Sequence, residues 1–305
     1  MHSPNKPKLF SFADFAMIIT TACWGLNFVI TKSATGHEPN QFRIFIYNII
    51  RFPVAAMLLF LTARLKRRKI MICGRDLITT ALLSFFGIFV YQILYMTGQT
   101  MTGSANIGVT YSIVPILIVI ISIISKIEKP TVFTFVGVLL GFCGLVLIVF
   151  EGGSLTLDKG SFLFFLGLVC WAFYSVYSKP ILDRNAPIII TAWVLFFGSL
   201  FQLPLAIYQA PYQIWTELSG QNILFVFVSA LLSLYIGYTL FYYSVAKIGP
   251  VRTGLYTNLT PVFTIFFAIT IRNETIRPVQ IIGFIIIVCG ILLSKINYRL
   301  FTADT

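Results

Sequence analysis

The stretch GSANIGVTYSIVPILIVIISIISKIEKPTVFTFVGVLLGFCG, residues 103–144, decides the fold, because its glycine, proline and glutamate positions recur 146 residues later. The second copy reads GPVRTGLYTNLTPVFTIFFAITIRNETIRPVQIIGFIIIVCG, residues 249–290, and aligns without a gap. The matched residues are Gly103, Gly108, Pro115, Glu128, Gly137, Cys143 and Gly144, which correspond to Gly249, Gly254, Pro261, Glu274, Gly283, Cys289 and Gly290. A fixed period of this kind indicates an internal duplication, so the chain is predicted to contain two copies of one unit.

The composition places the chain in a membrane. Hydrophobic residues make up 58% of its 305 residues, charged residues only 10%, and the mean hydropathy is +0.90. Soluble domains have about 25% charged residues, so the sequence predicts an integral membrane protein surrounded by the lipid bilayer. The net charge of +12 does not indicate a nucleic-acid partner, because the basic residues form short clusters between apolar runs and so fit a role in membrane orientation.

Ten apolar runs are long enough for membrane-spanning helices, which need about 20 mostly apolar residues. These runs lie at 12–33, 43–63, 77–98, 104–125, 131–150, 160–179, 188–208, 222–244, 251–271 and 278–296. Arg51 interrupts the second run. The apolar segment after it, from Phe52 to Ala63, has 12 residues and is too short to cross alone. We therefore expect Arg51 to lie inside the membrane.

The duplication predicts an all-α membrane protein of ten transmembrane helices, arranged as two inverted five-helix repeats. The repeats are expected at residues 12–150 and 160–297, joined by a linker from Glu151 to Lys159. Because five is an odd number, the second copy must enter the membrane in the opposite sense. Further matches lie 147 residues apart: Cys23, Trp24 and Lys32 with Cys170, Trp171 and Lys179, and Tyr91 and Tyr95 with Tyr238 and Tyr242.

The distribution of basic residues predicts the orientation. With the N-terminus in the cytoplasm, sixteen of the 22 Lys and Arg residues lie on the cytoplasmic side and five on the other, namely Lys32, Arg43, Lys159, Arg272 and Arg277. Cytoplasmic loops carry the excess of Lys and Arg. Both termini are therefore expected in the cytoplasm.

Pro115 and Pro261 fall near the middle of the fourth and ninth predicted helices, where proline removes a backbone hydrogen bond and bends the helix. Two interpretations stay open: a fixed bend that improves packing, or a hinge for alternating access. Glu128 and Glu274, at the ends of the same helices, are interpreted as interfacial ion-pair partners, with ion binding as the alternative.

Arg51 is the most informative single charge, and the equivalent position in the second copy is Gly198. A charged residue inside a membrane usually faces a partner or a cavity. One interpretation is that it bonds helix-end carbonyls or extends along a tilted helix. The other is that it attracts a carboxylate or another anionic group of a substrate.

Aromatic residues share helix faces with hydrogen-bonding groups in four predicted helices. Such residues are often interfacial anchors, but four repeat-related faces of this kind also suit a cavity for an amphipathic small molecule. The predicted substrate-binding residues are Trp24, Asn27, Arg51, Tyr91, Tyr95, Trp171, Tyr174, Tyr238 and Tyr242.

Catalytic signatures are missing from the sequence. Only two histidines occur, His2 and His37, and both lie outside the predicted helices. No Walker A, G-x-S-x-G or H-E-x-x-H pattern is present, and no carboxylate lies in the middle of a predicted helix. We therefore predict that the chain is not an enzyme and uses neither a cofactor nor a metal ion.

Several of these motifs resemble one known family. They are C-W-G-L-N-F at Cys23–Phe28 followed by Lys32, R-F-P-V-A-A beginning at Arg51, the two proline helices, and the paired glutamates and glycines. Together they resemble the EamA family of the drug/metabolite transporter superfamily over about residues 12–297. The resemblance implies inverted repeats around a central cavity in a bacterial inner membrane, and small-molecule transport, often amino-acid export. Tyr91 and Tyr95 resemble the cavity aromatics of aromatic amino acid exporters. The sixth helix departs from the first, with Ala172 and Tyr174 in place of Gly25 and Asn27.

The leading hypothesis is a secondary transporter that exports a small amphipathic metabolite, an amino acid among the candidates, by alternating access. The alternatives are a passive channel or facilitator and a non-transporting membrane receptor. The sequence leaves the substrate, the coupling ion and the oligomeric state open.

Overall fold

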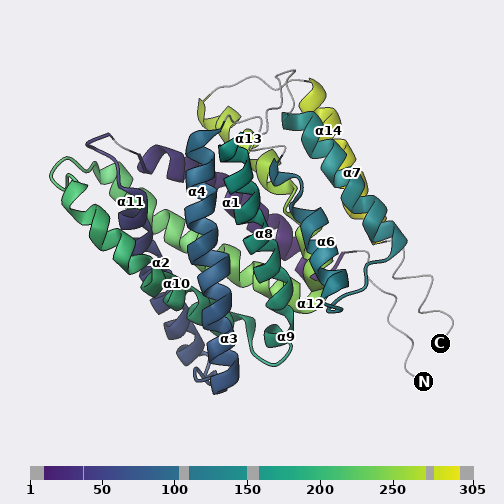
Figure 1. The fold of residues 1–305 in the computed structure, drawn as a ribbon, viewed down its shortest axis with the longest axis horizontal. Helices are drawn as coiled ribbons and strands as arrows, with labels where there is room; N and C mark the ends of the chain where they lie inside the picture. The colour runs from purple at the N-terminus through teal and green to yellow at the C-terminus, as the bar shows by residue number, and fades with distance from the viewer. Residues whose placement is uncertain (1–9, 37, 103–109, 150–157, 273–277, 296–305) are drawn as a thin grey trace.

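The computed structural model describes residues 10–36, 38–102, 110–149, 158–272 and 278–295, and these ranges are helical apart from turns, loops and one isolated bridge between Thr35 and Phe42 (Figure 1). The N-terminal part contains α1 (Phe12–Ala34), α2 (Ile44–Leu65), α3 (Gly74–Ser84), the π-helix η1 (Phe85–Val90), α4 (Tyr91–Met101), α6 (Val114–Ile124) and α7 (Val132–Val149). The C-terminal part contains α8 (Lys159–Tyr177), α9 (Lys179–Leu182), α10 (Pro187–Gln209), η2 (Ala210–Tyr212), α11 (Gly220–Ser229), η3 (Ala230–Tyr238), α12 (Thr239–Tyr256), α13 (Leu259–Arg272) and α14 (Pro278–Leu293). Predictions on Gly103, Gly108, Glu274 and most of the linker lie outside the described residues.

Six of the described helices are long and apolar enough to cross a membrane, and shorter apolar helices accompany them. The six are Phe12–Ala34, Ile44–Leu65, Gly74–Met101, Lys159–Leu182, Pro187–Tyr212 and Gly220–Tyr256. Large apolar side chains on both the long and the shorter helices are exposed, with Leu65 of α2, Ile124 of α6 and Val132 of α7 between 74% and 75% accessible. An apolar surface of this extent requires lipid rather than water around it.

The eighth and ninth predicted helices separate where expected, at Gly249, and a further break divides the ninth. The helix from Gly220 runs to Tyr256, with a kink at Gly249, whose φ of 79° and ψ of 162° are not helical. Glycine adopts this backbone conformation without the steric penalty of a Cβ atom. The following helix, α13, begins only at Leu259.

The two prolines related by the repeat lie in the first turns of helices. Pro115 lies in the first turn of α6 and Pro261 in the first turn of α13. The expected disruption of each predicted helix is present, but it takes the form of a break just before the proline instead of a bend within a continuous helix. In a first turn the missing N–H has no intrahelical partner to lose, so proline is tolerated there. The fourth and ninth segments are each interrupted just before the proline, at residues 112–113 and 257–258.

A π-helical stretch lies at equivalent places in the two parts of the chain. η1 follows α3, and η3 follows α11. In each case the π-helix ends at one of the tyrosines that the repeat relates. Tyr91 directly follows η1, and Tyr238 is the last residue of η3. Insertions of π-helix into α-helices are frequent at functional sites.

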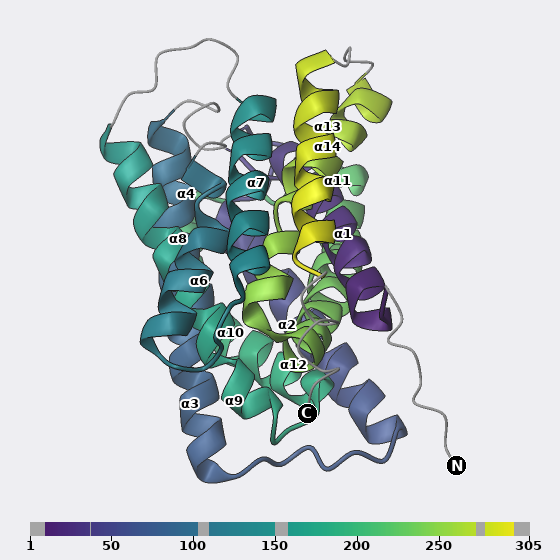
Figure 2. The ribbon, with the colours of Figure 1, turned by 90° about the vertical axis from the view of Figure 1, so that its right-hand side faces the viewer.

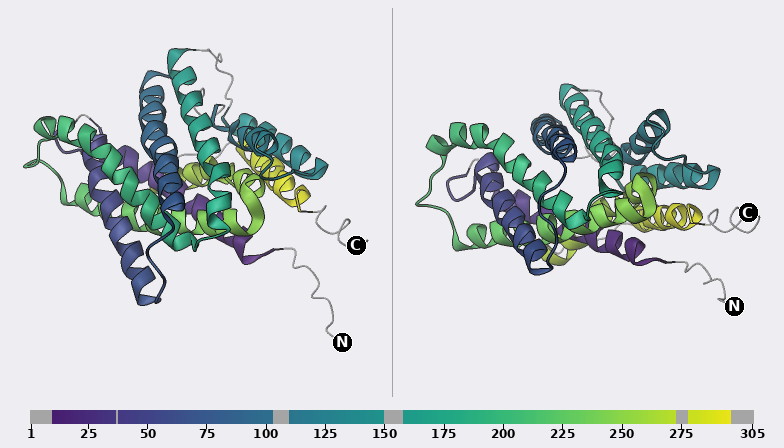
Figure 3. Two further views of the ribbon diagram at one scale, coloured as in Figure 1. Left: turned by 60° about the horizontal axis from the view of Figure 1, so that its bottom comes forward. Right: turned by 90° about the horizontal axis from the view of Figure 1, so that it is seen from below.

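The packing between helices is reciprocal. α1 packs against η3, α12 and α13, whereas α8 packs against η1, α4 and α6, so each contacts the matching elements of the other part. α2 pairs with α10, and α7 pairs with α14. Figure 3 shows α7 and α14 at one end of the molecule and α2, α10 and α11 at the other. This arrangement is the one that the duplication in the sequence requires.

Four glycines of the duplicated stretch hold α7 against α14, which lie side by side in Figure 2. A Cβ atom on Gly137 would stand 2.5 Å from the carbonyl oxygen of Gly290, and one on Gly144 would stand 2.6 Å from that of Gly283. Small residues let membrane helices approach this closely. The packing interpretation of the paired glycines is therefore correct.

Candidate functional site

A cavity of about 370 Å³ lies between α1, α2, α4, α8 and η3. Seven of the nine predicted substrate-binding residues line it: Trp24, Asn27, Arg51, Tyr91, Tyr95, Trp171 and Tyr238. Its volume falls in the range of small-molecule sites. The duplication thus brings together residues that lie more than 200 positions apart in the sequence.

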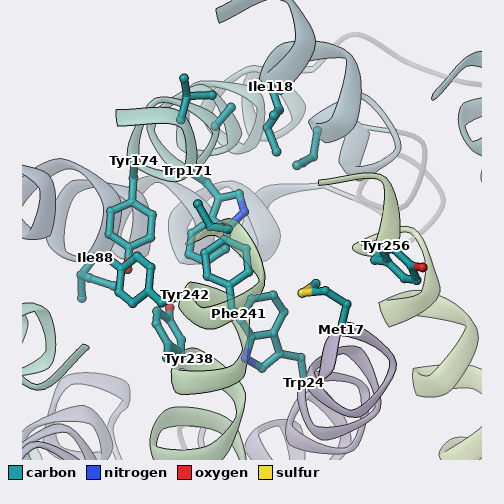
Figure 4. Close-up of a cluster of buried hydrophobic side chains, with 14 of the residues drawn as sticks. Met17, Trp24, Ile88, Ile118, Trp171, Tyr174, Tyr238, Phe241, Tyr242 and Tyr256 are labelled. Carbon is teal, nitrogen blue, oxygen red and sulfur yellow. The ribbon is translucent and has the colours of Figure 1, made fainter. Parts of the chain in front are cut away.

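Aromatic rings line the end of the cavity that lies away from its exposed mouth, called here the closed end. Figure 4 shows Trp24, Trp171 and Tyr238 within one cluster of buried side chains. The rings of Trp24 and Trp171 lie edge to face with centroids 5.6 Å apart, and Tyr238 lies 5.6 Å from Trp24 and 6.0 Å from Trp171. Tyr91 extends the cluster at 5.4 Å from Trp171. Edge-to-face rings at these separations attract one another beyond their buried area, so the cluster is a firm apolar surface for a ligand.

Tyr174 and Tyr242 lie behind this cluster and not on the cavity wall. Both side chains are completely buried, and the Tyr242 hydroxyl donates a hydrogen bond to the Tyr174 hydroxyl at 2.6 Å. The ring of Tyr174 fills the space above Gly87 in η1, where a Cβ atom would stand 2.2 Å from the ring. The missing side chain of Gly87 therefore gives Tyr174 a packing site away from the cavity.

Wide turns in η3 supply carbonyl acceptors to α1. The Trp24 indole N–H donates to the carbonyl of Ser233 at 3.3 Å, and the Thr20 hydroxyl donates to that of Gly237 at 3.3 Å. A buried indole N–H needs such a partner. The π-helix thereby fixes the orientation of Trp24 at the cavity wall.

Arg51 is buried beside the cavity and is held by neutral groups. Its Nε donates to Asn48 Oδ1 at 3.0 Å, and its Nη1 donates to Ser229 Oγ at 2.9 Å and to Asn27 Oδ1 at 3.5 Å. The side chain is 5% exposed, and no carboxylate of the described residues forms an ion pair with it. The structure therefore presents a desolvated cation without a counter-ion at the cavity wall.

Two aromatic rings also face the Arg51 guanidinium, Tyr47 at 5.0 Å and Phe52 at 5.3 Å. Contacts of this kind attract a cation to the ring face, but they do not neutralise it. The sequence did not single out Asn48, Ser229 or Tyr47. Only the three-dimensional neighbourhood of Arg51 reveals them, although Asn48 lies three residues before it, one helical turn away.

The other end of the cavity reaches the surface at the C-terminal ends of α1 and α4. Lys32, Gln99 and Thr100 line the cavity there and are exposed. Tyr111, which the sequence reasoning missed, lines the wall and is 9% exposed. Its position four residues before Pro115 was the signal available in the sequence.

Polar contacts of Asp14 and Glu128 join helices at the opposite end of the molecule. Asp14, 1% exposed, accepts hydrogen bonds from Tyr256 at 2.7 Å and Arg252 at 3.3 Å, and its Oδ1 lies 3.2 Å from Lys295 Nζ. These contacts join the start of α1 to the end of α12 and to the residues that follow α14.

Glu128 forms the second contact at this end of the molecule. Its carboxylate accepts the backbone N–H of Val251 at 3.0 Å and stands against Gly249, where any Cβ atom would lie 2.6 Å from the carboxylate oxygens. Burial raises the pKa of Glu128, and the hydrogen bond from Val251 partly opposes this effect. Its partner in the structure is thus a backbone N–H and not the neighbouring lysines, which corrects the expectation of an ion pair.

The described residues contain no group of three or more His, Cys, Asp or Glu side chains placed to hold a metal ion. The five cysteines are free thiols, and three of them are exposed.

Apolar outer faces, paired helices and an aromatic cavity with a buried arginine define an integral membrane protein of the transporter class. The sequence model of the EamA-like transporter family matches residues 11–150 and 158–296, so the chain belongs to the EamA-like transporter family. The resemblance found in the motifs is thereby confirmed.

Relatives of known sequence carry transporter names. An uncharacterized transporter of Bacillus subtilis, YyaM, is 23% identical over 285 residues, which cover 89% of this chain and 89% of that protein. A second B. subtilis protein, the uncharacterized transporter YetK, is 27% identical over 84% of this chain and 79% of its own. A probable terminal-alkyne amino-acid exporter of Streptantibioticus cattleyicolor is 22% identical over 95% of this chain and 94% of its own.

A crystal structure of a protein that is 18% identical to this chain has the same fold. The two superimpose with a TM-score of 0.75 over 93% of this chain and 97% of the other. At this level of identity the similarity supports the fold alone.

Proposed function

We propose that the chain is a secondary transporter that moves a small amphipathic metabolite across the cytoplasmic membrane by alternating access, with export as the working direction. Amino acids are among the candidate substrates, since one relative is named a probable amino-acid exporter. One observation carries the proposal: Arg51 is 5% exposed, has no carboxylate partner among the described residues and lies in an aromatic cavity. A buried arginine of this kind suits a substrate with an anionic group.

Alternating access is supported by the asymmetry of the cavity. One end reaches the exposed residues Lys32, Gln99 and Thr100, while the aromatic cluster and the Asp14 and Glu128 contacts close the other. Under the proposed orientation, with both termini in the cytoplasm, this form opens away from the cytoplasm. The matched breaks before Pro115 and Pro261 are the proposed hinges, and the proposed repeats are residues 12–150 and 160–297.

A passive facilitator is the second candidate, and counterflow separates the two. The experiment uses purified full-length protein in proteoliposomes loaded with a panel of unlabelled amino acids and aromatic metabolites. A carrier accelerates uptake of the labelled compound when the inside holds the same compound, since a reorienting site exchanges one molecule for another. Saturable flux with counterflow supports the proposal. Flux without saturation or counterflow favours a facilitator, and no flux for any compound contradicts both.

The variant Arg51→Ala tests the role of the anion site within the same assay. We expect it to insert and purify normally and to lose at least about tenfold in flux, the effect of losing one charge-assisted hydrogen bond. Arg68→Ala, on the exposed segment after α2, is the matched control and should retain wild-type flux. Unchanged flux in the Arg51 variant would assign that residue to packing.

A further inference from the structure

We propose that the cavity selects organic monoanions, with an aromatic or apolar body, one carboxylate and no ammonium group, over zwitterions and amines. This inference rests on the proposed function, because it names the substrate class of the same site. It narrows the substrate class from amphipathic metabolites in general to carboxylates without an ammonium group. An ordinary amino acid is then a poor substrate.

Charge is the first observation. The described residues that line the cavity include two cations, Arg51 at the inner wall and Lys32 at the mouth, and no aspartate or glutamate. Three described carboxylates form their contacts elsewhere: Asp14 with Arg252 and Lys295, Asp76 with Arg184, and Glu128 with the Val251 N–H. A cavity lined by one sign of charge concentrates ligands of the opposite sign. The field therefore favours anions and opposes a positive group.

The state of Arg51 is the second observation. Its charge is removed from water, and every hydrogen-bond acceptor that holds it is neutral. A buried charge is costly until a counter-ion with suitable geometry meets it. A carboxylate satisfies this need because the guanidinium presents its donors in a planar fork.

The third observation concerns the acceptors that an ammonium group would need. An ammonium ion carries three donors and no acceptor. The side-chain oxygen of Asn27 already receives Arg51 and Ser229, and the Ser233 carbonyl already receives Trp24. An amino acid whose carboxylate met Arg51 would bring its ammonium group against a lining that holds no carboxylate, where the acceptors left open, such as the Thr31 hydroxyl, are neutral. A neutral acceptor offsets only part of the cost of burying a charge.

The aromatic cluster accounts for the apolar body of the ligand. The rings of Trp24, Trp171 and Tyr238 stand within 6.0 Å of one another at the closed end, and Arg51 and Tyr238 line the same cavity. Its volume of about 370 Å³ suits a compound with a single ring. The body is expected against the rings and the carboxylate at Arg51.

Three probes with the same phenyl ring and two-carbon chain test the proposal: 3-phenylpropionate, phenylalanine and 2-phenylethylamine. They are an anion, a zwitterion and a cation. Binding to purified protein is measured from ligand-dependent thermal stabilisation, and flux in proteoliposomes. We expect 3-phenylpropionate to bind at least about tenfold more tightly than phenylalanine and 2-phenylethylamine not to bind at millimolar concentration.

The inference is overturned if phenylalanine binds as tightly as 3-phenylpropionate or more tightly. It is also overturned if only 2-phenylethylamine binds, or if none of the three probes binds. Counterflow of phenylalanine without that of 3-phenylpropionate leaves the proposed function intact and removes only the selectivity. If no compound in the panel of amino acids and aromatic metabolites shows counterflow, the proposed function is contradicted as well. The two failures are therefore distinguishable.

Three variants of cavity residues test the preference for the anion over the zwitterion. Arg51→Gln keeps hydrogen-bond donors but removes the charge, so it should reduce the preference for 3-phenylpropionate over phenylalanine at least about fivefold. Gln92→Glu places a carboxylate of nearly the same shape on the cavity wall and should shift the preference toward phenylalanine. Lys32→Gln changes only an exposed residue at the mouth, so it keeps the test open if Arg51→Gln fails to fold, and it should weaken anion binding in a salt-dependent way. An unchanged preference in all folded variants overturns the proposal.

Discussion

The Tyr242 hydroxyl donates a hydrogen bond to the Tyr174 hydroxyl at 2.6 Å, and both side chains are completely buried. This pair lies behind the Trp171 ring, whose centroid is 5.2 Å from that of Tyr174. The two tyrosines therefore support the closed end of the cavity without forming its surface. Their predicted role in substrate contact becomes a structural one.

Removing one hydroxyl of this pair should lower stability without changing ligand affinity. In Tyr242→Phe the buried Tyr174 hydroxyl loses its partner, at a cost of about 1 to 3 kcal/mol. The thermal midpoint of the purified protein should fall, while the affinity for a transported ligand stays within about twofold, since no contact on the cavity surface changes. Tyr238→Phe, on the cavity wall, is the comparison and should alter affinity. An equal effect of both variants on affinity would place Tyr242 in the substrate path.

The Gly87 position should tolerate no side chain. A Cβ atom there would stand 2.2 Å from the Tyr174 ring, so Gly87→Ala must displace a fully buried tyrosine and should destabilise by about 1 to 3 kcal/mol. Gly220→Ala is the matched control, because nothing lies within 4 Å of its Cβ position. Thermal midpoints of the two variants measure the difference. Similar midpoints would mean that Tyr174 has another place to pack.

The contacts of Asp14 should contribute more to the free energy of unfolding than a surface ion pair does. Asp14→Asn removes the charge that faces Arg252 and Lys295, and Lys295 is only 6% exposed. Leaving a buried cation unpaired costs about 3 to 5 kcal/mol. Asp183→Asn breaks the exposed pair with Lys179 and should cost at most about 1 kcal/mol.

A second substitution tests whether the unpaired cation is the cause. The double variant Asp14→Asn with Lys295→Met removes that cation. Its thermal midpoint should lie above that of Asp14→Asn alone. No restoration would show that the hydrogen bonds of Asp14, including that from Tyr256, matter more than the ion pair.

The raised pKa of Glu128 should make the stability of the protein depend on pH. Burial raises its pKa above the usual 4.5, so the folded protein favours the protonated carboxyl group. The resulting stabilisation is fully present below pH 4.5 and is lost as the pH rises through the raised pKa. Glu128→Gln keeps an oxygen for the Val251 N–H and does not titrate. We therefore expect the midpoints of the two proteins to converge at low pH and the wild type to fall below the variant at higher pH. A constant difference between about pH 4 and 8 would contradict this assignment.

Much of the site could be predicted because duplication and hydropathy constrain it. The short apolar run after Arg51 required a longer helix around it, and Arg51 is buried within α2. The repeat paired Trp24 with Trp171, and the two rings indeed meet. These predictions depend on spacing, which the sequence displays directly.

Other features could not be predicted because they depend on backbone hydrogen bonding and on contacts between distant residues. η1 and η3 arise from a shift of hydrogen-bond partner along the chain, which apolar sequences such as that of residues 85–90 do not mark. The place of Tyr174 depends on a glycine in another helix, Gly87. The starts of α6 and α13 depend on where the helix before each proline ends, and an apolar run gives no sign of that point.

The reciprocal packing of α1 also sets a condition on biosynthesis. α1 is translated before the helices it packs against: Trp24 bonds to Ser233, 209 residues later, and Asp14 bonds to Tyr256, 242 residues later. Until those residues are made, the nascent chain holds a carboxylate and an indole without their final partners. α1 therefore acquires these partners only after the segment that reaches Tyr256 has been translated.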